Sequence, residues 1–514
     1  MPAFAGPRQD PLALTLCVAA LAVYAWLILR SGFQVDGTTW YTLIDDAMIS
    51  MRYAQHLAAG HGLVWNVGEP PIQGFSNPLW TLWFALLHLL LPAGAQVPLA
   101  VMASAALLLV VAGLTLRGLV LELAPSARPA ALLALFLLLA HYPLVFWSLR
   151  GMESALAALL ALQAARATLQ VDTRHGEAVQ AGLYMTAMLA LRIDLAAQVG
   201  VLVGWLAWRR GALARPTLTA ALPPAALLLV LLTWQAWYFG SALPNTYHLK
   251  MDGVTAAARI ELGLAVLPYA ARELLPLGAL IAAALWRCPA CREPRMALLI
   301  ALGVVQVLYS LYVGGDYAEP RTVSQVGGAN RFITQGLPFL LAASALALTA
   351  LDRGAAGRAR NLRHVAAALV LLVLMHGHTW PRWLAANAAL LDTDIWRARL
   401  GLHLARHTAQ DAVIAVHAAG QIPYYSARRA IDLLGKSDAH VARVAPVAPF
   451  RPGHNKWDYA YSIGRLQPDV VADEWGASRA WLAERSDYLR LANGIHLRRD
   501  SDAAPRADLA RAYR

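Results

Sequence analysis

The sequence predicts a mainly α-helical protein that crosses a membrane many times and ends in a small soluble α/β domain. Of its 514 residues, 58% are hydrophobic and only 14% are charged, and the mean hydropathy is +0.47. Soluble domains carry roughly 25% charged residues, so the composition excludes a soluble protein. Apolar runs recur between Leu12 and His376, many close to the ~20 residues that cross a hydrocarbon core.

The apolar runs predict about eleven transmembrane helices. They are Leu12–Leu29, Pro98–Leu116, Pro129–Phe146, Met152–Leu169, Ala178–Leu191, Leu195–Trp208, Pro216–Phe239, Tyr269–Trp286, Met296–Tyr312, Phe332–Ala350 and Val365–His376. No small-residue cleavage site follows the first run, so we expect it to remain as a span.

Arginine clusters between the runs predict the orientation, because cytoplasmic loops are enriched in Lys and Arg. The clusters are Arg117 with Arg128, Arg166 with Arg174, Arg209 with Arg210 and Arg215, Arg287 with Arg292 and Arg295, and Arg353 with Arg358, Arg360 and Arg363. All these clusters fall in cytoplasmic loops if the N-terminus lies in the cytoplasm and each apolar run crosses the membrane once. We therefore expect a multi-pass protein of the bacterial inner membrane whose first long loop, residues 31–96, and whose tail face the periplasm.

Two segments outside these spans have their own signals. Pro78–Leu91 is only 14 residues long and would reverse the alternation if it crossed, so it is predicted to be interfacial or re-entrant; an ordinary short span is the alternative. In the tail, Asp411–Gly420 and Pro468–Asp473 resemble strands between helical stretches. The domain prediction is a transmembrane module over residues 1–382 and a periplasmic α/β domain over residues 383–514.

Charge and cysteine content exclude other classes. The net charge is +12, but the arginines lie in short clusters between apolar runs and form no single basic face, so we expect no nucleic-acid partner. Cys288 and Cys291 form a CxxC without the second pair that a structural zinc site needs. We expect the cysteines to be reduced and inert.

The first long loop carries the strongest functional signal. Asp45 and Asp46 are adjacent and precede a helical pattern of Ile49, Tyr53 and Leu57. This predicts an amphipathic helix at the membrane surface with the acidic pair at its N-terminus, where the helix dipole stabilises carboxylates in the ionised form that a general base needs. The alternative is helix capping with a charged first turn.

Short motifs in order along the chain resemble a known family. In the first loop they are Asp45-Asp46, Arg52-Tyr53, Gly60-His61-Gly62-Leu63 and Asn77-Pro78-Leu79-Trp80. Further along they are Arg150-Gly151-Met152-Glu153, Arg192-Ile193-Asp194, Leu243-Pro244-Asn245-Thr246-Tyr247 with Lys250, Gly314-Gly315-Asp316-Tyr317, and Arg331-Phe332. In the tail they are Pro423-Tyr424-Tyr425, Asp432-Leu433-Leu434-Gly435 and Gly453-His454-Asn455-Lys456-Trp457. Together they resemble the terminal arabinofuranosyltransferases of mycobacterial cell walls.

That family belongs to the GT-C glycosyltransferases, a fold that it shares with protein O-mannosyltransferases and the aminoarabinose transferases of lipid A. The resemblance implies an inverting transferase that moves a sugar, arabinofuranose, from a polyprenyl-phosphate carrier to a glycan or another cell-envelope acceptor. One departure is Ile193, where the family has proline. The implied partners are membrane lipids, the lipid-linked donor and the acceptor.

The resemblance also implies roles for residues. Asp45 is the expected general base and Asp46 orients the acceptor. Donor phosphate and sugar are expected to contact Arg52, Glu153, Arg192, Asp194, Asn245, Tyr247, Lys250, Asp316 and Arg331. The acceptor is expected to contact His61, Asn66, Asn77, His454 and Lys456. The predicted topology places Asp45, Glu153, Arg192, Lys250, Asp316 and Arg331 on one side of the membrane, which indicates one site.

The sequence leaves several alternatives open. Some GT-C members use a divalent metal and others do not; Asp45 and Asp46, with Asp316, would supply oxygen ligands for Mg²⁺ or Ca²⁺. Another lipid-linked sugar, mannose or aminoarabinose, on a protein or lipid acceptor is the alternative within the enzyme class. A transporter or lipid flippase is the alternative outside that class, although no internal repeat supports it.

Overall fold

The computed structural model describes residues 10–92, 94–171, 176–316, 330–352, 357–385 and 389–511. Arg174, Tyr317 and Arg353, which the sequence motifs include, lie outside these ranges. The chain forms two compact units. The helical unit comprises Met1–Arg30, Met102–Leu229 and Arg259–Ala388, and the α/β unit comprises Ser31–Val101, Val230–Ala258 and Ala389–Arg514.

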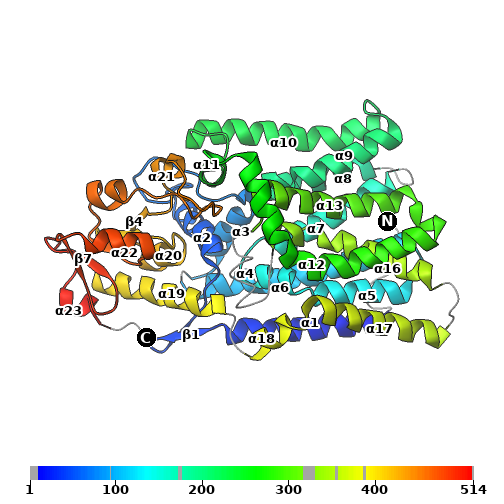
Figure 1. Cartoon of the computed structure of the whole chain (residues 1–514), viewed down its shortest axis with the longest axis horizontal. Coiled ribbons are helices and arrows are strands. Elements are labelled where there is room, and N and C mark those ends of the chain that lie inside the picture. The colour runs from blue at the N-terminus through cyan, green and yellow to red at the C-terminus, as the bar shows by residue number, and fades with distance from the viewer. Residues whose placement is uncertain are drawn as a thin grey trace. The chain divides into compact units, whose positions relative to one another are not determined.

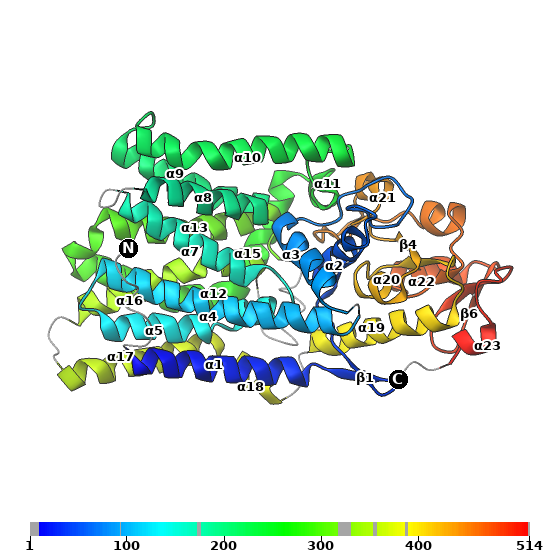
Figure 2. The same ribbon diagram turned by 180° about the vertical axis from the view of Figure 1, so that it is seen from behind.

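The helical unit consists of helices that run roughly side by side in both views (Figures 1 and 2). They are α1 (Pro11–Arg30), α4 (Gln96–Leu123), α5 (Arg128–Leu139), α6 (Tyr142–Leu149), α7 (Ser154–Gln170), α8 (Glu177–Leu191), α9 (Ala196–Arg210), α10 (Arg215–Phe239), α12 (Ala256–Arg287), α13 (Pro294–Val313), α15 (Arg331–Thr334), α16 (Leu337–Leu351), α17 (Gly357–His376) and α18 (Thr379–Ala385). Helices α4, α10 and α12 extend into the stretches assigned to the α/β unit.

Within the described residues, six helices are long and apolar enough to span a membrane. These are α1, α4, α10, α12, α13 and α17, and the bent pair α5–α6 brings the number to seven. The four other predicted spans coincide with α7, α8, α9 and α16, which have 15–17 residues. Such helices are only ~23–26 Å long, which is short for a ~30 Å core. The number eleven therefore stays a prediction.

The predicted span Pro129–Phe146 is not one continuous helix. It is broken between Leu139 and Tyr142 with a bend of 46°. Pro143 lies in the first turn of α6, where its missing N–H is tolerated, and His141 caps that turn by accepting the Leu144 N–H at 3.2 Å. The proline in the sequence was the signal for this break.

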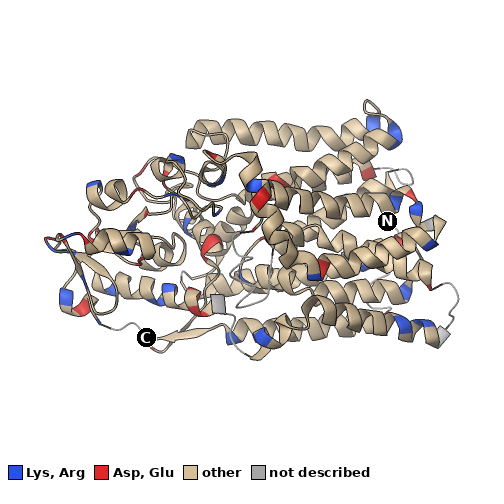
Figure 3. Ribbon diagram, in the orientation of Figure 1, with Lys and Arg blue, Asp and Glu red and all other residues tan. Residues whose placement is uncertain are grey.

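Exposed apolar side chains explain how the helical unit meets lipid. On α10, Leu222 and Leu229 are 60% and 69% exposed. Facing helices pack through small residues instead: α7 buries alanines such as Ala158, Ala161 and Ala165, which let helices approach closely. Lys and Arg gather mainly at helix ends (Figure 3). The chain is a multi-pass membrane protein, as predicted.

The tail folds around a five-stranded sheet of order β4-β3-β5-β7-β6. Its strands are β3 (Val413–Val416), β4 (Arg429–Asp432), β5 (Val470–Val471), β6 (Tyr488–Arg490) and β7 (His496–Arg498). Strands β4, β3 and β5 are parallel, whereas β7 is antiparallel to β5 and β6. The flanking helices are α19 (Ala389–His407), α20 (Gln421–Ser426), α21 (Ala439–Arg443), α22 (Gly476–Ala483), α23 (Arg506–Leu509) and the π-helix Ala460–Arg465. The predicted C-terminal α/β fold is confirmed.

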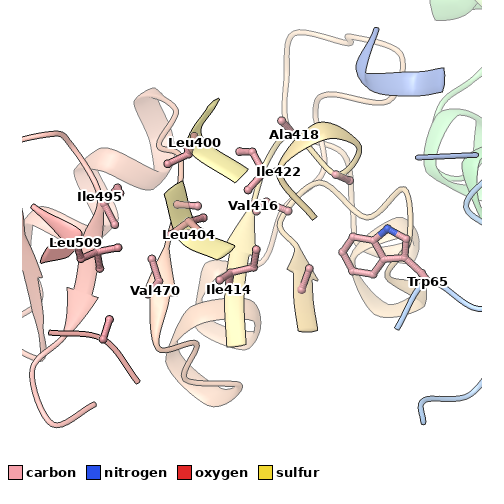
Figure 4. Close-up of a cluster of buried hydrophobic side chains, with 14 of the residues drawn as sticks. Trp65, Leu400, Leu404, Ile414, Val416, Ala418, Ile422, Val470, Ile495 and Leu509 are labelled. Atoms are coloured by element: carbon pink, nitrogen blue, oxygen red, sulfur yellow. The ribbon is translucent and has the colours of Figure 1, made fainter. Parts of the chain in front are cut away.

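The first long loop belongs to the same unit as the tail. It contains the hairpin β1 (Phe33–Val35) and β2 (Thr38–Trp40), and helices α2 (Asp45–Ala58) and α3 (Pro78–Leu90); α11 (Asn245–Met251) joins it from later in the chain. The helix predicted after Asp45 is present. Its apolar face, with Ile49 and Tyr53, is buried in one core with tail residues such as Ile414, instead of lying on the membrane. Figure 4 shows part of this core, with Ile414 and Val416 near its centre and Trp65 of the first loop at its edge.

Helix α3 coincides with the segment predicted to be interfacial or re-entrant. Its 13 residues span only ~20 Å, too short for a ~30 Å core. Trp80 is 2% exposed and contacts Phe84 with ring centroids 5.4 Å apart, so this tryptophan packs in the protein. The interfacial assignment stays a prediction.

Candidate active site

The acidic pair begins α2, as the sequence predicted. Asp45 is 7% exposed, whereas the Asp46 side chain is 39% exposed. The two carboxylates therefore differ in environment although they are neighbours in the chain. The protein surrounds Asp45, and Asp46 remains open to solvent or to a ligand.

Backbone N–H groups of the tail hold the Asp45 carboxylate. Its Oδ1 accepts hydrogen bonds from Gly420 N at 2.9 Å and from Gln421 N at 3.2 Å, at the start of α20. A Cβ atom at position 420 would lie only 2.1 Å from the Asp45 carbonyl oxygen. The close approach therefore requires glycine at position 420.

A lysine that the sequence analysis missed lies against the acidic pair. Lys436 Nζ is 3.6 Å from Asp45 Oδ2 and 3.9 Å from Asp46 Oδ1. Burial opposes the lysine charge, but the carboxylates of Asp45, Asp46 and Asp432 outweigh burial and raise the pKa of Lys436. The side chain is therefore an ammonium ion throughout the physiological pH range.

Two sequence signals could have revealed Lys436. It directly follows Asp432–Gly435, which was already part of the family resemblance. In addition, the chain has only three lysines, Lys250, Lys436 and Lys456, among 43 basic residues, and all three lie in the α/β unit. In a chain that otherwise uses arginine for its positive charges, the few lysines are candidates for a specific role.

The turn that carries Lys436 is fixed by hydrogen bonds. Asp432 accepts from the backbone N–H groups of Leu434 at 2.9 Å, Gly435 at 3.1 Å and Ser437 at 2.6 Å. The Asn245 amide donates to the carbonyls of Gly435 at 2.8 Å and Lys436 at 3.3 Å. Asn245, predicted to contact the donor, therefore holds this turn.

Lys250 and His454 lie near the acidic pair. A Cβ atom on Gly453 would lie 3.4 Å from Lys250 Cε. Burial lowers the pKa of His454 well below its usual value, and Lys436 and Lys250 lower it further, whereas Asp46 opposes the shift. The His454 ring stacks on Trp475 with centroids 5.7 Å apart. His454 is therefore a neutral ring beside two ammonium groups.

Two residues predicted to contact ligands, Arg52 and Asn66, make several hydrogen bonds within the protein. Arg52 is 3% exposed and donates to the carbonyls of Trp65 at 2.6 Å, Arg428 at 2.8 Å and Pro423, and to Asn66 at 2.9 Å. Asn66 also bonds both backbone groups of Ala430. These bonds join the first loop to the tail and favour a structural role for Arg52 and Asn66.

Three other residues predicted to contact the acceptor differ from one another in exposure. Asn77 is 4% exposed and its Oδ1 accepts from Ser50 Oγ at 2.7 Å. Lys456 is 0% exposed and donates to the carbonyls of His248 at 3.1 Å and Ala442 at 2.8 Å. His61 is exposed, as is Tyr247 from the predicted donor set. Only the exposed residues present their side chains outward.

The remaining predicted donor contacts lie in the helical unit. Arg192 donates to Asp194 through Nε at 2.8 Å and Nη2 at 2.7 Å, and also pairs with Glu153. Arg331 pairs with Asp316 through Nε at 3.0 Å and lies over the Trp147 ring at 5.1 Å. These residues belong to a different unit from Asp45, so the prediction of one common site stays a prediction.

The acidic pair does not fit a metal site in this arrangement. The Lys436 ammonium already lies against both carboxylates. Across the described residues, no group of three or more His, Cys, Asp or Glu side chains is arranged to hold a metal ion. The positive charge beside Asp45 and Asp46 comes from the chain itself.

Comparisons with known proteins agree with this architecture. Two crystal structures of ArnT from Cupriavidus metallidurans match over nearly the whole chain. The apo structure aligns with TM-score 0.57 and 14% identity over 95% of this chain and 98% of that one; the structure bound to undecaprenyl phosphate aligns with TM-score 0.57 and 13% identity over 98% and 100%. The chain has the GT-C fold.

Sequence comparisons add less than the fold does. Residues 388–504 match a domain of unknown function (DUF8728), which covers most of the tail. No curated protein matches the sequence. At 13–14% identity the likeness to ArnT establishes the fold alone.

Proposed function

We propose that the chain is an inverting glycosyltransferase that moves a sugar from a polyprenyl phosphate to an acceptor hydroxyl. The observation that carries this proposal is the Asp45 carboxylate, held through Oδ1 by two backbone N–H groups, with Oδ2 facing Lys436 at 3.6 Å. That distance is too long for a hydrogen bond, so Oδ2 keeps acceptor capacity for a substrate proton. The GT-C fold, which ArnT bound to undecaprenyl phosphate shares, supports a lipid-linked donor.

The proposed reaction uses Asp45 as general base. Asp45 Oδ2 takes the proton of the acceptor hydroxyl while that oxygen attacks the anomeric carbon. The bond from this carbon to the phosphate oxygen breaks, and its electron pair leaves with the polyprenyl phosphate. Attack opposite the leaving group inverts the configuration. A general base of this kind contributes about 10²–10⁴ to the rate.

The other groups of the site have supporting roles. The Lys436 ammonium balances the two adjacent carboxylates and fixes their orientation, while Asp46 is open to the acceptor. Lys250 is a cation of the kind that stabilises a departing phosphate. From the helical unit, Arg331 is proposed for the same task, and Glu153, Arg192 and Asp194 for sugar binding.

Arabinofuranose is the proposed sugar, on the family resemblance of the motifs. The likeness of the fold to ArnT supports aminoarabinose as the second candidate. The distribution of arginines between the apolar runs supports an inner-membrane location with the site and the tail on the periplasmic face. The acceptor is proposed to be a glycan or another component of the cell envelope.

The test uses purified protein, an acceptor panel, and polyprenyl-phosphoryl arabinofuranose, aminoarabinose or mannose with a radiolabelled sugar. We expect wild type to transfer label from one donor and Asp45→Asn to transfer none. Both proteins should have the same melting temperature, which shows that the variant is folded. Silence with all three donors, together with lipid movement across a vesicle, would replace the transferase with a flippase.

A further inference from the structure

A pocket of about 360 Å³ lies in the α/β unit, apart from the acidic pair. Three stretches form it: Ile72 and Gln73 of the first loop, the segment from the end of α10 to the start of α11, and α21 of the tail. Its size falls within the ~300–1,000 Å³ range of small-molecule sites. None of the sequence motifs pointed to this pocket as a site of its own.

An unpaired amide marks the wall of this pocket. Gln73 is 2% exposed, and both its Nε2 and its Oε1 have no hydrogen-bond partner among the residues that the structure describes. Buried polar side chains are paired in the large majority of cases, so an orphaned amide indicates a missing ligand or water. An amide both donates and accepts, which matches adjacent hydroxyl groups.

The rest of the lining suits a sugar ring. Phe239 supplies an apolar face, and Ser241, His440 and Arg443 supply polar groups. Arg443 already donates through Nη1 to Asn245 Oδ1 at 3.2 Å and to the Ala439 carbonyl at 3.1 Å, so this nitrogen is engaged. The lining combines a single arginine with an amide and a hydroxyl, which suits neutral hydroxyl groups better than a phosphate, because phosphate sites gather several charged N–H donors.

The pocket is connected to the acidic pair through Asn245. This residue lines the pocket, and its backbone N–H donates to the Gln73 carbonyl at 2.9 Å. Its side-chain amide donates to the Lys436 carbonyl at 3.3 Å, and Lys436 in turn faces Asp45. A ligand in the pocket would therefore lie beside Asn245, which is hydrogen-bonded directly to the turn that carries Lys436.

We propose that this pocket binds a saccharide unit of the acceptor, next to the unit whose hydroxyl reaches Asp45. The pocket is then a specificity site: its hydroxyl-binding groups select a glycan acceptor over a simple alcohol. The proposal rests on the proposed transferase function for its role, but saccharide binding itself can be measured without any transfer.

The binding experiment uses the full chain in detergent and saturation-transfer NMR. The probes are an α-1,5-linked arabino-oligosaccharide, mannotriose and inorganic phosphate. We expect one of the saccharides to bind, Gln73→Leu and Arg443→Gln to weaken that binding at least tenfold, and Arg499→Gln, an exposed arginine outside the pocket, to leave it unchanged. Arg443→Gln changes an exposed residue, so it serves if Gln73→Leu does not fold.

Two results would overturn the proposal: binding of phosphate but of neither saccharide, and saccharide binding that neither pocket variant weakens. Where transfer is observed, the variants should raise the acceptor KM at least tenfold without changing kcat or the donor KM. Saccharide binding that the variants abolish, in a protein without transfer, would refute the transferase and keep the pocket. Transfer by the variants with an unchanged acceptor KM would refute the pocket and keep the transferase.

Discussion

The acidic pair of the α/β unit and two arginine clusters of the helical unit differ in how tightly their charges are paired. In the helical unit, Arg192 contacts both oxygens of Asp194 at 2.7–2.8 Å, and the Arg331–Asp316 pair is joined at 3.0 Å. In the α/β unit, Lys436 remains 3.6 Å from Asp45. A direct arginine pair occupies the acceptor capacity of a carboxylate, whereas the looser lysine pair leaves an oxygen available for a proton. The tight pairs fix the positions of their charges, whereas the loose pair is the one suited to take a proton.

The largest expected effect comes from breaking the loose pair at its acid. Asp45→Asn should lower the transfer rate by about 10²–10⁴, because the amide cannot take a proton although its oxygen can still accept from Gly420 and Gln421. The rate of sugar transfer measures this. Asp46→Asn, the neighbouring control, should cost far less, and equal losses for the two variants would contradict the assignment of the base.

The tight pairs should respond in stability. Arg192→Gln leaves Glu153, which is 2% exposed, and Asp194 without their common cation, and should cost about 3–5 kcal/mol of unfolding free energy. Thermal unfolding in detergent measures the loss. Arg363→Gln is the control: Arg363 pairs with Asp352 at 2.8 Å, but its side chain is 64% exposed, so it should cost below ~1 kcal/mol. Similar losses of unfolding free energy in the two variants would show that the Arg192 cluster stabilises the fold no more than an exposed ion pair does.

Removing the lysine should have an intermediate effect on rate. Lys436→Gln removes the cation beside Asp45 and Asp46 and should lower kcat about tenfold, equivalent to ~1.4 kcal/mol in the barrier. Steady-state kinetics at saturating donor and acceptor measure the change. Lys456→Gln, at a lysine that donates to the carbonyls of His248 and Ala442, should leave kcat unchanged. A loss of kcat in Lys456→Gln without a loss in Lys436→Gln would contradict the role proposed for Lys436.

The smallest effect depends on pH. The pKa of His454 is lowered in the folded protein by burial and by the neighbouring lysines, so below pH ~6.5 the unfolded chain takes up a proton that the folded chain does not. Wild type should therefore lose stability relative to His454→Phe as the pH falls below ~6.5, by up to ~1.4 kcal/mol per unit.

Phenylalanine keeps the ring that stacks on Trp475, and His61→Phe, at an exposed histidine, is the control. Melting temperatures between pH 7 and pH 5 measure the difference. A constant gap between wild type and His454→Phe over this range would contradict the lowered pKa.

The fold could be predicted from local signals, because apolar length and alternating strand patterns are properties of short segments. All the predicted spans coincide with helices, and the two predicted strand segments of the tail contain β3 and β5, whereas β4, β6 and β7 were not predicted. The break at His141 was missed although Pro143 marked it. The acidic pair was also identified correctly as the start of a helix.

The partners of the acidic pair could not be predicted in the same way. Gly420 lies 375 residues after Asp45 in the chain, and no local pattern connects the two. For the same reason the bonds of Arg52 and Asn66 to the tail could not be predicted: their polarity is visible in the sequence, but the tail groups that they bond are not.

The close approach of Gly420 to Asp45 has a consequence for biosynthesis. During translation the aspartate leaves the ribosome hundreds of residues before the glycine, and Lys436 follows later still. A nascent or prematurely terminated chain therefore carries the acidic pair without the groups that hold it. The groups that hold the proposed base are complete only when synthesis is nearly finished, so we expect an unfinished chain not to carry out the proposed transfer.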